Sequence, residues 1–284
     1  MKILLTGATG QLGKSVQSKV QPRNHSIVTC NRSELDISNF AQVQRLFESE
    51  RPDYVLNAAA YTNVPAAQKE FNAALSANAY GPLNLALAAE NNGAKLIHIS
   101  TNFVFGGEDL SYADVHAPTS PLNFYGVSKL AGEMAVIAQN SQNNFIVRTS
   151  SLYSEYAENF LTKILRKLKD NTSEIKVVSD QYSQPTYAGD LAEQIINLIE
   201  SESAPGIYHF VNNGNPSWFE FAKAIARISG HNEERILPIS FRDFDDGVNR
   251  PAAALLRPTL LTNSDPIDRT WISALDDCLK KVEA

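Results

Sequence analysis

Three glycines at three-residue spacing follow a short apolar run at the start of the chain, in MKILLTGATGQLGKSVQSKV. Residues 2–6 predict a buried strand, and the apolar spacing from Gln11 onward predicts a helix. Gly7, Gly10 and Gly13 allow a tight turn and a close approach of the backbone to a ligand. Because a helix N-terminus offers unpaired N–H groups and a partial positive charge to an anion, the segment predicts a site for a dinucleotide pyrophosphate. An ordinary glycine-rich strand-to-helix turn is the alternative.

Strand-like and helix-like segments alternate along the first half of the chain. Strands are predicted over residues 26–30, 54–57, 95–100 and 145–149, and helices over residues 40–50, 72–92 and 128–140. Such alternation favours a parallel sheet with helices on both faces, in which ligands sit beyond the carboxyl ends of the strands. We therefore expect a Rossmann-type α/β fold.

The pattern changes after Thr149, where the connections become longer and more polar. Helices are predicted over residues 159–170 and 218–230, and a short strand over residues 175–178. We expect residues 1–150, completed by parts of about 187–212, to form a cofactor-binding domain. Residues 151–284 would form mainly a smaller C-terminal substrate-binding lobe.

Composition and charge exclude several classes of function. The 284 residues are 43% hydrophobic and 20% charged, as in ordinary soluble globular proteins. The net charge of −6 argues against a nucleic-acid-binding surface, and no apolar run approaches the roughly 20 residues of a membrane span. Cys30 and Cys278 can build neither a disulfide framework nor a zinc site, so we expect reduced thiols, no metal and a cytoplasmic location. Side chains expected in the core include His98, His209, Trp218, Phe219 and Phe221.

A tyrosine and a lysine four residues apart, Tyr125 and Lys129, predict the catalytic centre, because this spacing puts both on one face of a helix. The pKa of a free tyrosine is about 10, and a neighbouring ammonium lowers it, so that the phenol can exchange a proton near neutral pH. Such a phenol can protonate a carbonyl that is receiving hydride, while the lysine bonds the nicotinamide ribose. Ser100 and Thr101 follow a predicted strand, and we favour Thr101 for the substrate carbonyl, with Ser100 as a supporting group.

Longer motifs surround these residues. They are GATGQLG at 7–13, LDIS at 35–38, RPDYVLNAAAYTNV at 51–64, STNFVFGG at 100–107, PLNFYGVSKLAGE at 121–133, VVSDQYSQPTYAGDLA at 177–192 and Arg250-Pro251. On these motifs nearly the whole chain resembles the extended short-chain dehydrogenase/reductases, and within them the dTDP-4-dehydrorhamnose reductase family. The resemblance implies NAD(P)H-dependent reduction of the C4 keto group of a nucleoside-diphosphate 4-keto-6-deoxyhexose, in the biosynthesis of dTDP-L-rhamnose or a related deoxysugar.

The resemblance also implies which residues form the site. It implies Tyr125, Lys129 and Thr101 as the catalytic residues. The cofactor contacts would be Gly7, Gly10, Gln11, Leu12, Gly13, Asn31, Arg32, Asp36, Ile37, Ala58, Ala59, Ala60, Ile99, Tyr125 and Lys129. The substrate contacts would be Thr62, Val64, Thr101, Asn102, Phe103, Tyr125, Ser151, Gln184 and Arg250. We expect a monomer or homodimer that takes a nucleoside-diphosphate sugar and binds neither nucleic acid nor a membrane.

Two arginines, Arg32 and Arg250, are candidates to bind phosphate groups of the ligands. Asn31 and Arg32 follow the second predicted strand, where NAD-selective folds often carry an acid. Arg32 can pair with a 2′-phosphate, so we expect NADPH, with NADH as the alternative cofactor and a solvated surface arginine as the alternative role. The guanidinium of Arg250 suits the substrate pyrophosphate, and a structural salt bridge is its alternative.

Several residues depart from the usual pattern of the family. The family has S-T-D-Y-V-F where this chain has Asn102 and Phe103, and a tryptophan where it has Ser151. Pro65 and Gln68 replace two carboxylates of the family pattern. Because these changes lie on the substrate side, we expect a 4-ketoreductase whose sugar specificity has moved away from rhamnose. The related enzyme that yields 6-deoxy-L-talose is one such class.

Two other functions are alternatives. A non-catalytic nucleotide-binding regulatory subunit, resembling the β subunit of methionine adenosyltransferase, would account for the altered substrate residues. The retained Tyr125, Lys129 and Thr101 disfavour it. An epimerase or dehydratase of the same superfamily is disfavoured because dehydratases usually need a carboxylate pair, and Asn102 and Phe103 follow Thr101 here.

Overall fold

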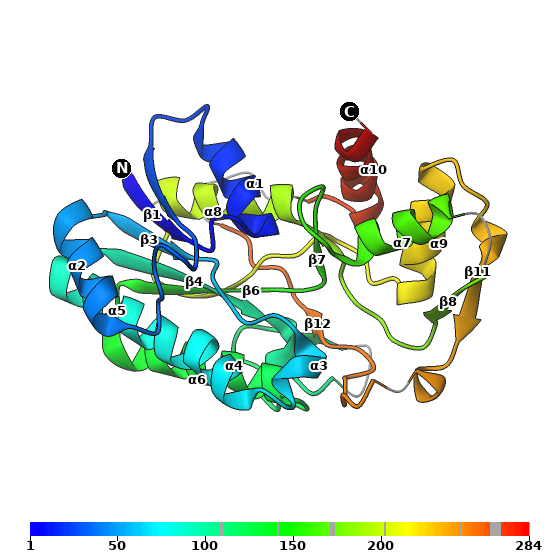
Figure 1. Cartoon of the computed structure of the whole chain (residues 1–284), viewed down its shortest axis with the longest axis horizontal. Coiled ribbons are helices and arrows are strands. Elements are labelled where there is room, and N and C mark those ends of the chain that lie inside the picture. The colour runs from blue at the N-terminus through cyan, green and yellow to red at the C-terminus, as the bar shows by residue number, and fades with distance from the viewer. Residues whose placement is uncertain are drawn as a thin grey trace.

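A parallel sheet between two layers of helices forms one half of the computed structural model (Figure 1). Its six strands are β1 (Lys2–Thr6), β2 (Ser26–Cys30), β3 (Tyr54–Asn57), β4 (Lys95–Thr101), β6 (Asn144–Thr149) and β10 (Gly206–His209). Their order is β10-β6-β4-β3-β1-β2, and every neighbouring pair is parallel. The structure describes residues 1–107, 111–140, 142–170, 174–201, 203–244, 246–261 and 268–283.

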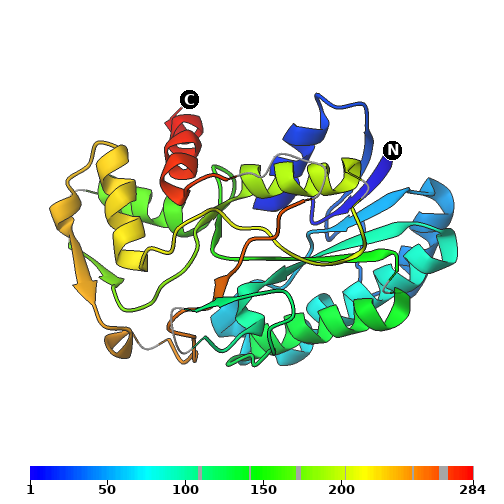
Figure 2. The same ribbon diagram turned by 180° about the vertical axis from the view of Figure 1, so that it is seen from behind.

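Helices cover both faces of this sheet. They are α1 (Gln11–Val20), α2 (Phe40–Glu50), α5 (Gly81–Asn92), α6 (Phe124–Asn140) and α8 (Ala188–Glu200). On one face α1 and α8 bury Val16 and Ile195 against Leu5, and on the other α2 and α5 bury Phe47 and Leu85. The view from behind shows the same two layers (Figure 2). The predicted Rossmann-type α/β fold is confirmed, and its buried strands are apolar on both faces because helices cover both.

The predicted helical stretch over residues 72–92 is confirmed, and it contains a π-helical turn between two α-helical segments. The structure has α3 (Val64–Ala67), α4 (Phe71–Leu75), a π-helical turn at Ser76–Tyr80 and then α5. Pro82, in the first turn of α5, cannot donate the N–H that a continuous α-helix would need. Residues Ser76–Tyr80, just before α5, have π-helical geometry, in which hydrogen bonds span five residues.

The helix that carries the predicted catalytic pair begins at Phe124 rather than at Ser128. The Asn123 side-chain oxygen accepts a hydrogen bond from the Gly126 N–H at 2.9 Å, which is the bond that a helix-capping residue makes. Tyr125 consequently stands in the first turn of α6, and Lys129 lies one turn further along the same face.

The second half of the chain builds short strand pairs and a second core. The strands are β5 (Tyr112–Ala113), β7 (Leu152–Tyr153), β8 (Ile175–Val178), β9 (Thr186–Tyr187), β11 (Ile236–Ile239) and β12 (Leu255–Leu256), paired as β11-β8, β12-β5 and β7-β9. The helices are α7 (Phe160–Lys169), α9 (Trp218–Ile228) and α10 (Trp271–Glu283), with short 3₁₀ turns at Asn102–Val104, Glu233–Arg235 and Phe241–Asp243. Phe221 and Leu275 lie at the centre of this second core. Within the described residues, no helix is both long and apolar enough to span a membrane.

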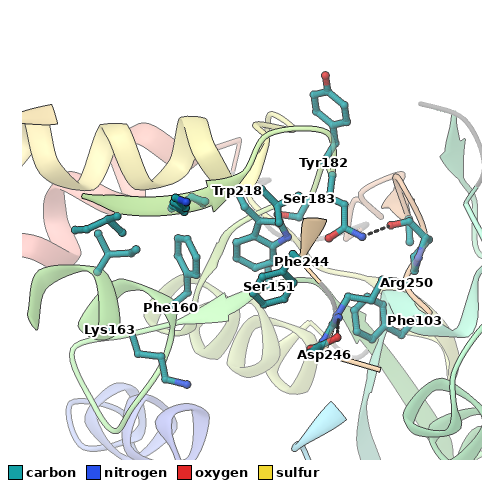
Figure 3. A pocket seen from close by; sticks show the side chains of 18 of the residues that line it. Phe103, Ser151, Phe160, Lys163, Tyr182, Ser183, Trp218, Phe244, Asp246 and Arg250 are labelled. Atoms are coloured by element: carbon teal, nitrogen blue, oxygen red, sulfur yellow. Dashed lines mark hydrogen bonds and ion pairs between the residues drawn. The ribbon is translucent and has the colours of Figure 1, made fainter. Parts of the chain in front are cut away.

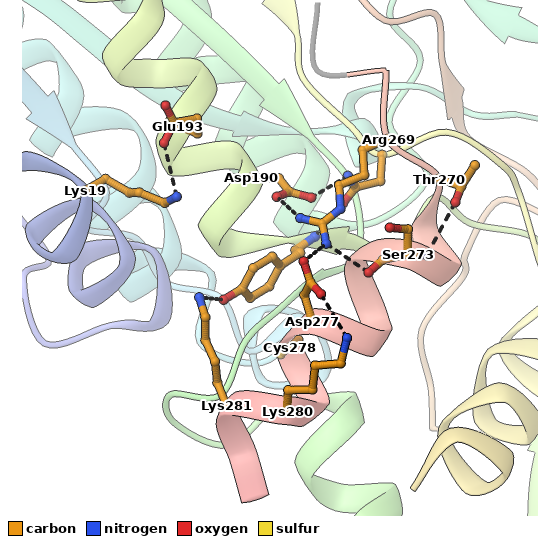
Figure 4. A network of polar contacts seen from close by, with 12 residues as sticks. Lys19, Asp190, Glu193, Arg269, Thr270, Ser273, Asp277, Cys278, Lys280 and Lys281 are labelled. Carbon is orange, nitrogen blue, oxygen red and sulfur yellow. Dashed lines mark hydrogen bonds and ion pairs between the residues drawn. The ribbon is translucent and has the colours of Figure 1, made fainter. Parts of the chain in front are cut away.

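A polar network ties α10 to the first turn of α8 (Figure 4). Arg269 Nη1 lies 2.8 Å from Asp190 Oδ1, and Arg269 Nη2 also bonds to Asp277. Lys281 Nζ donates to the Tyr187 hydroxyl at 2.7 Å. The charge of Asp190 also suits its place at a helix N-terminus. The C-terminal helix is thereby attached to a helix that covers the main sheet.

Candidate active site

The connection between β1 and α1 presents backbone rather than side chains at the carboxyl edge of the sheet. Gly7 has a φ of +68°, and a Cβ there would lie 2.6 Å from backbone atoms of Ala58 and Ala59. A Cβ on Gly13 would lie 2.3 Å from the Gly7 carbonyl oxygen. Gly10 caps α1 and is exposed to solvent. The N-terminus of α1 is therefore exposed and preceded by a turn without side chains, which is compatible with the dinucleotide pyrophosphate that the sequence predicts.

Strand register gathers further predicted cofactor residues at this edge. Thr6 pairs with Cys30 on one side and with Asn57 on the other, so the segments that follow these strands begin side by side. They carry Asn31, Arg32, Ala58, Ala59 and Ala60, while Ile99 lies in β4. Arg32 is exposed.

Other predicted cofactor residues are engaged within the fold. Asp36 accepts hydrogen bonds from the N–H and hydroxyl of Ser38, which hold the pKa of its carboxyl below the usual range. Ile37 is buried against Gly81 of α5, and Leu12 is buried in the core. Gln11 Nε2 donates to the carbonyl oxygen of Leu152, at 3.2 Å, and so links α1 to β7.

Thr101 and Tyr125, two of the predicted catalytic residues, meet in the structure. Thr101 ends β4, and its hydroxyl lies close enough to the Tyr125 phenol to influence its pKa, while it donates a hydrogen bond to Asn102 Oδ1 at 3.3 Å. Burial raises the pKa of Tyr125 to about 12, and the neighbouring Thr101 hydroxyl acts in the opposite direction. The ring of Phe103 stands edge-on to that of Tyr125, with centroids 5.9 Å apart. Tyr125 is therefore a neutral phenol at pH 7, held beside a hydroxyl.

Lys129 contacts the end of β4. Its Nζ donates to the carbonyl oxygen of Ile99 at 2.6 Å and lies 3.4 Å from His98 Nε2. Burial lowers the pKa of Lys129 to about 8, while the negative charge of Glu133 raises it. The expectation that Lys129 lowers the pKa of Tyr125 is wrong in this structure, because burial of the phenol dominates and raises that pKa.

A cavity of about 420 Å³ lies next to this centre (Figure 3). Four of the predicted substrate residues line it: Asn102, Phe103, Ser151 and Arg250. Ser151 has a φ of +46°, a conformation that non-glycine residues seldom adopt and that costs on the order of 1 kcal/mol. Such strain is common at ligand sites, where the surrounding structure holds the residue in place.

The remaining predicted substrate residues lie elsewhere. Thr62 is exposed, and Val64 is half-buried at the start of α3. Gln184 is buried, and its amide bonds to Leu256 in both directions, accepting from the N–H at 2.6 Å and donating to the carbonyl at 2.9 Å. The Gln184 side chain therefore joins two segments of the fold, and few of its hydrogen-bonding positions remain for a ligand.

Arg250 has the structural salt bridge that the sequence left as an alternative. Both of its Nη atoms bond to the carboxylate of Asp246, at 2.6 and 2.5 Å. Both side chains line the cavity. A phosphate that bound Arg250 would therefore compete with Asp246 for the guanidinium.

Several residues that line the cavity were not predicted from the sequence. Phe221 is buried in the core as predicted, but Trp218 lines the cavity and its ring lies 4.7 Å from that of Phe160. The cavity wall also includes the basic residues Lys163, Arg166 and Lys167. The apolar periodicity of residues 160–169 could have identified these three basic residues. It places the apolar side chains of the helix on one buried face and leaves lysine and arginine on the other.

Comparison with known proteins identifies the family. Residues 1–284 match the family model described as RmlD substrate binding domain. The chain is 35% identical to a dTDP-4-dehydrorhamnose reductase from Clostridium acetobutylicum, with a TM-score of 0.95 over 100% of both chains. It is 38% identical to a dTDP-4-dehydrorhamnose reductase from Bacillus anthracis solved in complex with NADP, with a TM-score of 0.93 over 99% of each chain. A dTDP-4-keto-6-deoxy-D-glucose reductase from Streptomyces niveus is 34% identical over 99% of this chain and 97% of its own. The chain therefore belongs to the dTDP-4-dehydrorhamnose reductase family of extended short-chain dehydrogenase/reductases.

Proposed function

We propose that this protein reduces the C4 keto group of a dTDP-linked 4-keto-6-deoxyhexose, with NADPH as the reductant. The observation that carries this proposal is the position of the buried Tyr125 phenol beside Thr101 at the end of β4 and against the ring of Phe103 in the cavity wall. Asn102 and Phe103, which follow Thr101 in the chain, line the cavity. Ile99, a predicted cofactor contact, precedes Thr101 in β4. A proton donor thus stands where a cofactor and a sugar would meet.

The residues of the glycine loop and the neighbouring strand ends would hold the cofactor. The nicotinamide ring, when bound, supplies the hydride for the carbonyl carbon. Gly7, Gly10 and Gly13 leave room for the pyrophosphate at the N-terminus of α1, and the exposed Arg32 is available to a 2′-phosphate. Lys129 would bond the nicotinamide ribose. The Bacillus anthracis relative solved with NADP supports this choice of cofactor.

Tyr125 would supply the proton. With a pKa of about 12 its phenol is protonated at neutral pH, and the Thr101 hydroxyl lies beside it. As the C4 oxygen gains negative charge, the phenolic proton passes to that oxygen, leaving an alcohol and a phenolate. A positioned acid of this kind contributes about 10²–10⁴-fold to a rate.

The cavity would hold the sugar nucleotide. The adjoining rings of Phe160 and Trp218 offer an apolar wall to the base. Lys163, Arg166 and Lys167 bring positive charge toward the diphosphate. Because Ser151 and Phe103 lack the groups usual in the family, the sugar subsite differs from that of the rhamnose-forming relatives, and we propose a shifted sugar specificity.

We also propose how the chain is organised and where it acts. Residues 1–150, with parts of about 187–212, would bind the cofactor, and residues 151–284 would form mainly the sugar-nucleotide lobe. The return of β10 to the main sheet supports this division. The enzyme would act in the cytoplasm as a monomer or homodimer, and the two free, buried cysteines are compatible with a reducing compartment.

Replacement of Tyr125 by Phe tests the proposal. Oxidation of NADPH, followed by absorbance with a panel of dTDP-4-keto-6-deoxyhexoses, should fall about 10²–10⁴-fold, while NADPH binding measured by fluorescence stays within a factor of two or so. Tyr182→Phe removes a hydroxyl at the cavity wall and should keep most of the turnover. Product configuration at C4 is then determined by NMR.

Near-wild-type turnover in Tyr125→Phe would reject the assigned proton donor. Wild-type protein that binds NADPH but turns over none of the sugars would instead favour a non-catalytic nucleotide-binding role.

A further inference from the structure

A line of buried polar side chains crosses three strands and ends at Lys129. Thr6 in β1 donates its hydroxyl to Asn57 Oδ1 in β3 at 2.7 Å. Asn57 Nδ2 lies 3.0 Å from His98 Nδ1 in β4, and His98 Nε2 lies 3.4 Å from Lys129 Nζ. None of the four side chains is more than 2% exposed. The parallel register, which sets Thr6 beside Asn57 and Asn57 beside His98, produces this line.

One backbone group determines the direction of the hydrogen bonds. The Ala59 N–H can only donate, and it points to Asn57 Oδ1 at 3.2 Å. The other end of that amide, Nδ2, is therefore a donor toward His98 Nδ1, which must accept. A neutral imidazole carries a single N–H, so His98 has its proton on Nε2, facing Lys129.

His98 is neutral in the folded protein. Complete burial and the positive charge of Lys129 hold the pKa of His98 well below its usual range. The ring therefore presents an N–H, and no lone pair, to Lys129 Nζ at neutral pH.

We propose that His98 is a positioning residue for Lys129, whose Nε2–H stabilises the uncharged amine at Nζ while the Ile99 carbonyl fixes that atom in place. An ammonium has three donors and no acceptor, so it gains nothing from a facing N–H, whereas an uncharged amine accepts the bond with its lone pair. Lys129 then exchanges its proton close to neutral pH instead of remaining permanently charged. The consequence for the reaction rests on the proposed function, in which Lys129 bonds the nicotinamide ribose.

The other groups around Lys129 are compatible with this assignment. On α6 the facing titratable groups are Tyr125 and Glu133. Glu133 favours the ammonium, but both its oxygens bond to Arg148 of β6, and one accepts from Ser100 of β4. The π-helical turn packed against α6 contributes Asn78, which does not titrate. Burial outweighs Glu133, and Lys129 has a pKa of about 8. The bond that we propose from His98 acts in the same direction as burial. The ammonium therefore predominates below that pH and is lost as the pH rises above it.

The first measurement needs no substitution. In full-length protein labelled with [¹⁵N]histidine, the His98 ring nitrogens should show the Nε2-protonated neutral tautomer from pH 6 to 9, with the signal assigned by its loss in His98→Leu. A proton on Nδ1, or a charged ring in this range, would overturn the proposal.

The second measurement titrates Lys129 directly. In [ε-¹³C]lysine-labelled protein, with the signal assigned by its loss in Lys129→Met, the midpoint should lie near pH 8 and move up by about one pH unit in His98→Leu. His209→Leu, which removes another fully buried histidine of the sheet, should leave the midpoint unchanged. Asn57→Asp turns a donor into an acceptor, so it should move the His98 proton to Nδ1 and raise the Lys129 midpoint.

An unchanged midpoint in a folded His98→Leu variant would overturn the proposal whatever the turnover. A shifted midpoint in a protein that reduces no sugar would support the role of His98 and reject the reductase instead.

Discussion

The paired charges of Asp246 and Arg250 sit in the wall of the cavity (Figure 3). The guanidinium is the main cause that holds the pKa of Asp246 below its usual range, so the carboxylate stays charged at neutral pH. A diphosphate can bind this guanidinium only if it displaces the Asp246 carboxylate. A stronger ion pair between Asp246 and Arg250 therefore means weaker binding of the substrate.

Asp246→Asn should therefore improve substrate binding. Removal of the competing charge is expected to lower KM for the sugar nucleotide several-fold with kcat within a factor of about two, since one unscreened charge contact is on the order of 1 kcal/mol. Initial rates at fixed NADPH measure both constants. Asp243→Asn, a neighbouring exposed carboxylate with the same change of charge, is the control. A higher KM in Asp246→Asn would mean that the carboxylate positions Arg250 for the substrate.

Single residues were predictable where one local rule determines their place. Tyr125 and Lys129 could be placed together because side chains four positions apart in a helix lie on the same face. His98 was predicted as a core residue, and it is buried as expected. Its contact with Lys129 follows from strand register and from where α6 begins, and neither can be derived from local spacing. The direction of the pKa shift of Tyr125 was missed for a related reason, since burial depends on the whole surrounding structure.

At the scale of elements, the connection between β1 and α1 depends on glycine in two different ways. Gly13 is inside α1, where alanine would favour the helix by about 1 kcal/mol, yet a Cβ there meets the Gly7 carbonyl oxygen at 2.3 Å. Gly10 has an ordinary φ, and its Cβ would come no closer than 3.3 Å to that oxygen. A substitution at Gly13 should therefore affect both stability and ligand binding, whereas one at Gly10 should affect mainly ligand binding.

Gly13→Ala should lower the melting temperature and weaken NADPH binding at least about tenfold, because backbone atoms must shift to admit the Cβ. Gly10→Ala should keep the melting temperature within a few degrees but still weaken NADPH, because its Cβ enters the open end of α1. Calorimetry and fluorescence titration give the two quantities. A Gly13→Ala protein as stable as wild type would contradict the packing described here.

The elements predicted best are those with strong periodicity between clear boundaries. The strands over residues 26–30 and 54–57 have their predicted bounds, because each is a short run rich in β-branched and apolar residues between polar segments. The helical stretch over 72–92 was predicted close to its observed bounds, but its spacing did not reveal the π-helical turn at Ser76–Tyr80. The start of α6 was missed because the cap is made by Asn123, inside what looks like a loop.

At the scale of the whole molecule, α10 is attached through Arg269, which joins Asp190 of α8 to Asp277 of α10 (Figure 4). Asp190 also accepts from Asn212, which in turn accepts from the Tyr187 N–H. The arginine therefore supports a network that extends beyond its own ion pairs.

Arg269→Met should lower the free energy of unfolding by about 2 kcal/mol, because it leaves the mostly buried carboxylate of Asp190 without its charged partner. Lys280→Met removes an exposed pair with Asp276 and should change it by less than about 0.5 kcal/mol. Urea denaturation measures both. Equal effects would show that the Arg269 network contributes no more than surface charge.

The cavity was the least predictable feature. Its wall combines Asn102 and Phe103 after β4 with Phe160 on α7, Trp218 on α9 and Arg250 before β12. Periodicity identifies which face of each helix is apolar, but it does not say which faces meet. Trp218 was accordingly expected in the core, although it borders open space.

The return of the chain to its main sheet limits how this protein can be re-engineered. After β6 ends at Thr149, the polypeptide builds most of the cavity wall and then comes back to add α8 and the edge strand β10. A chimera joined at a single crossover near residue 150 would combine an edge strand from one parent with five strands from the other. Exchange of sugar preference between relatives should therefore succeed only when residues 188–209 are inherited together with the N-terminal segment.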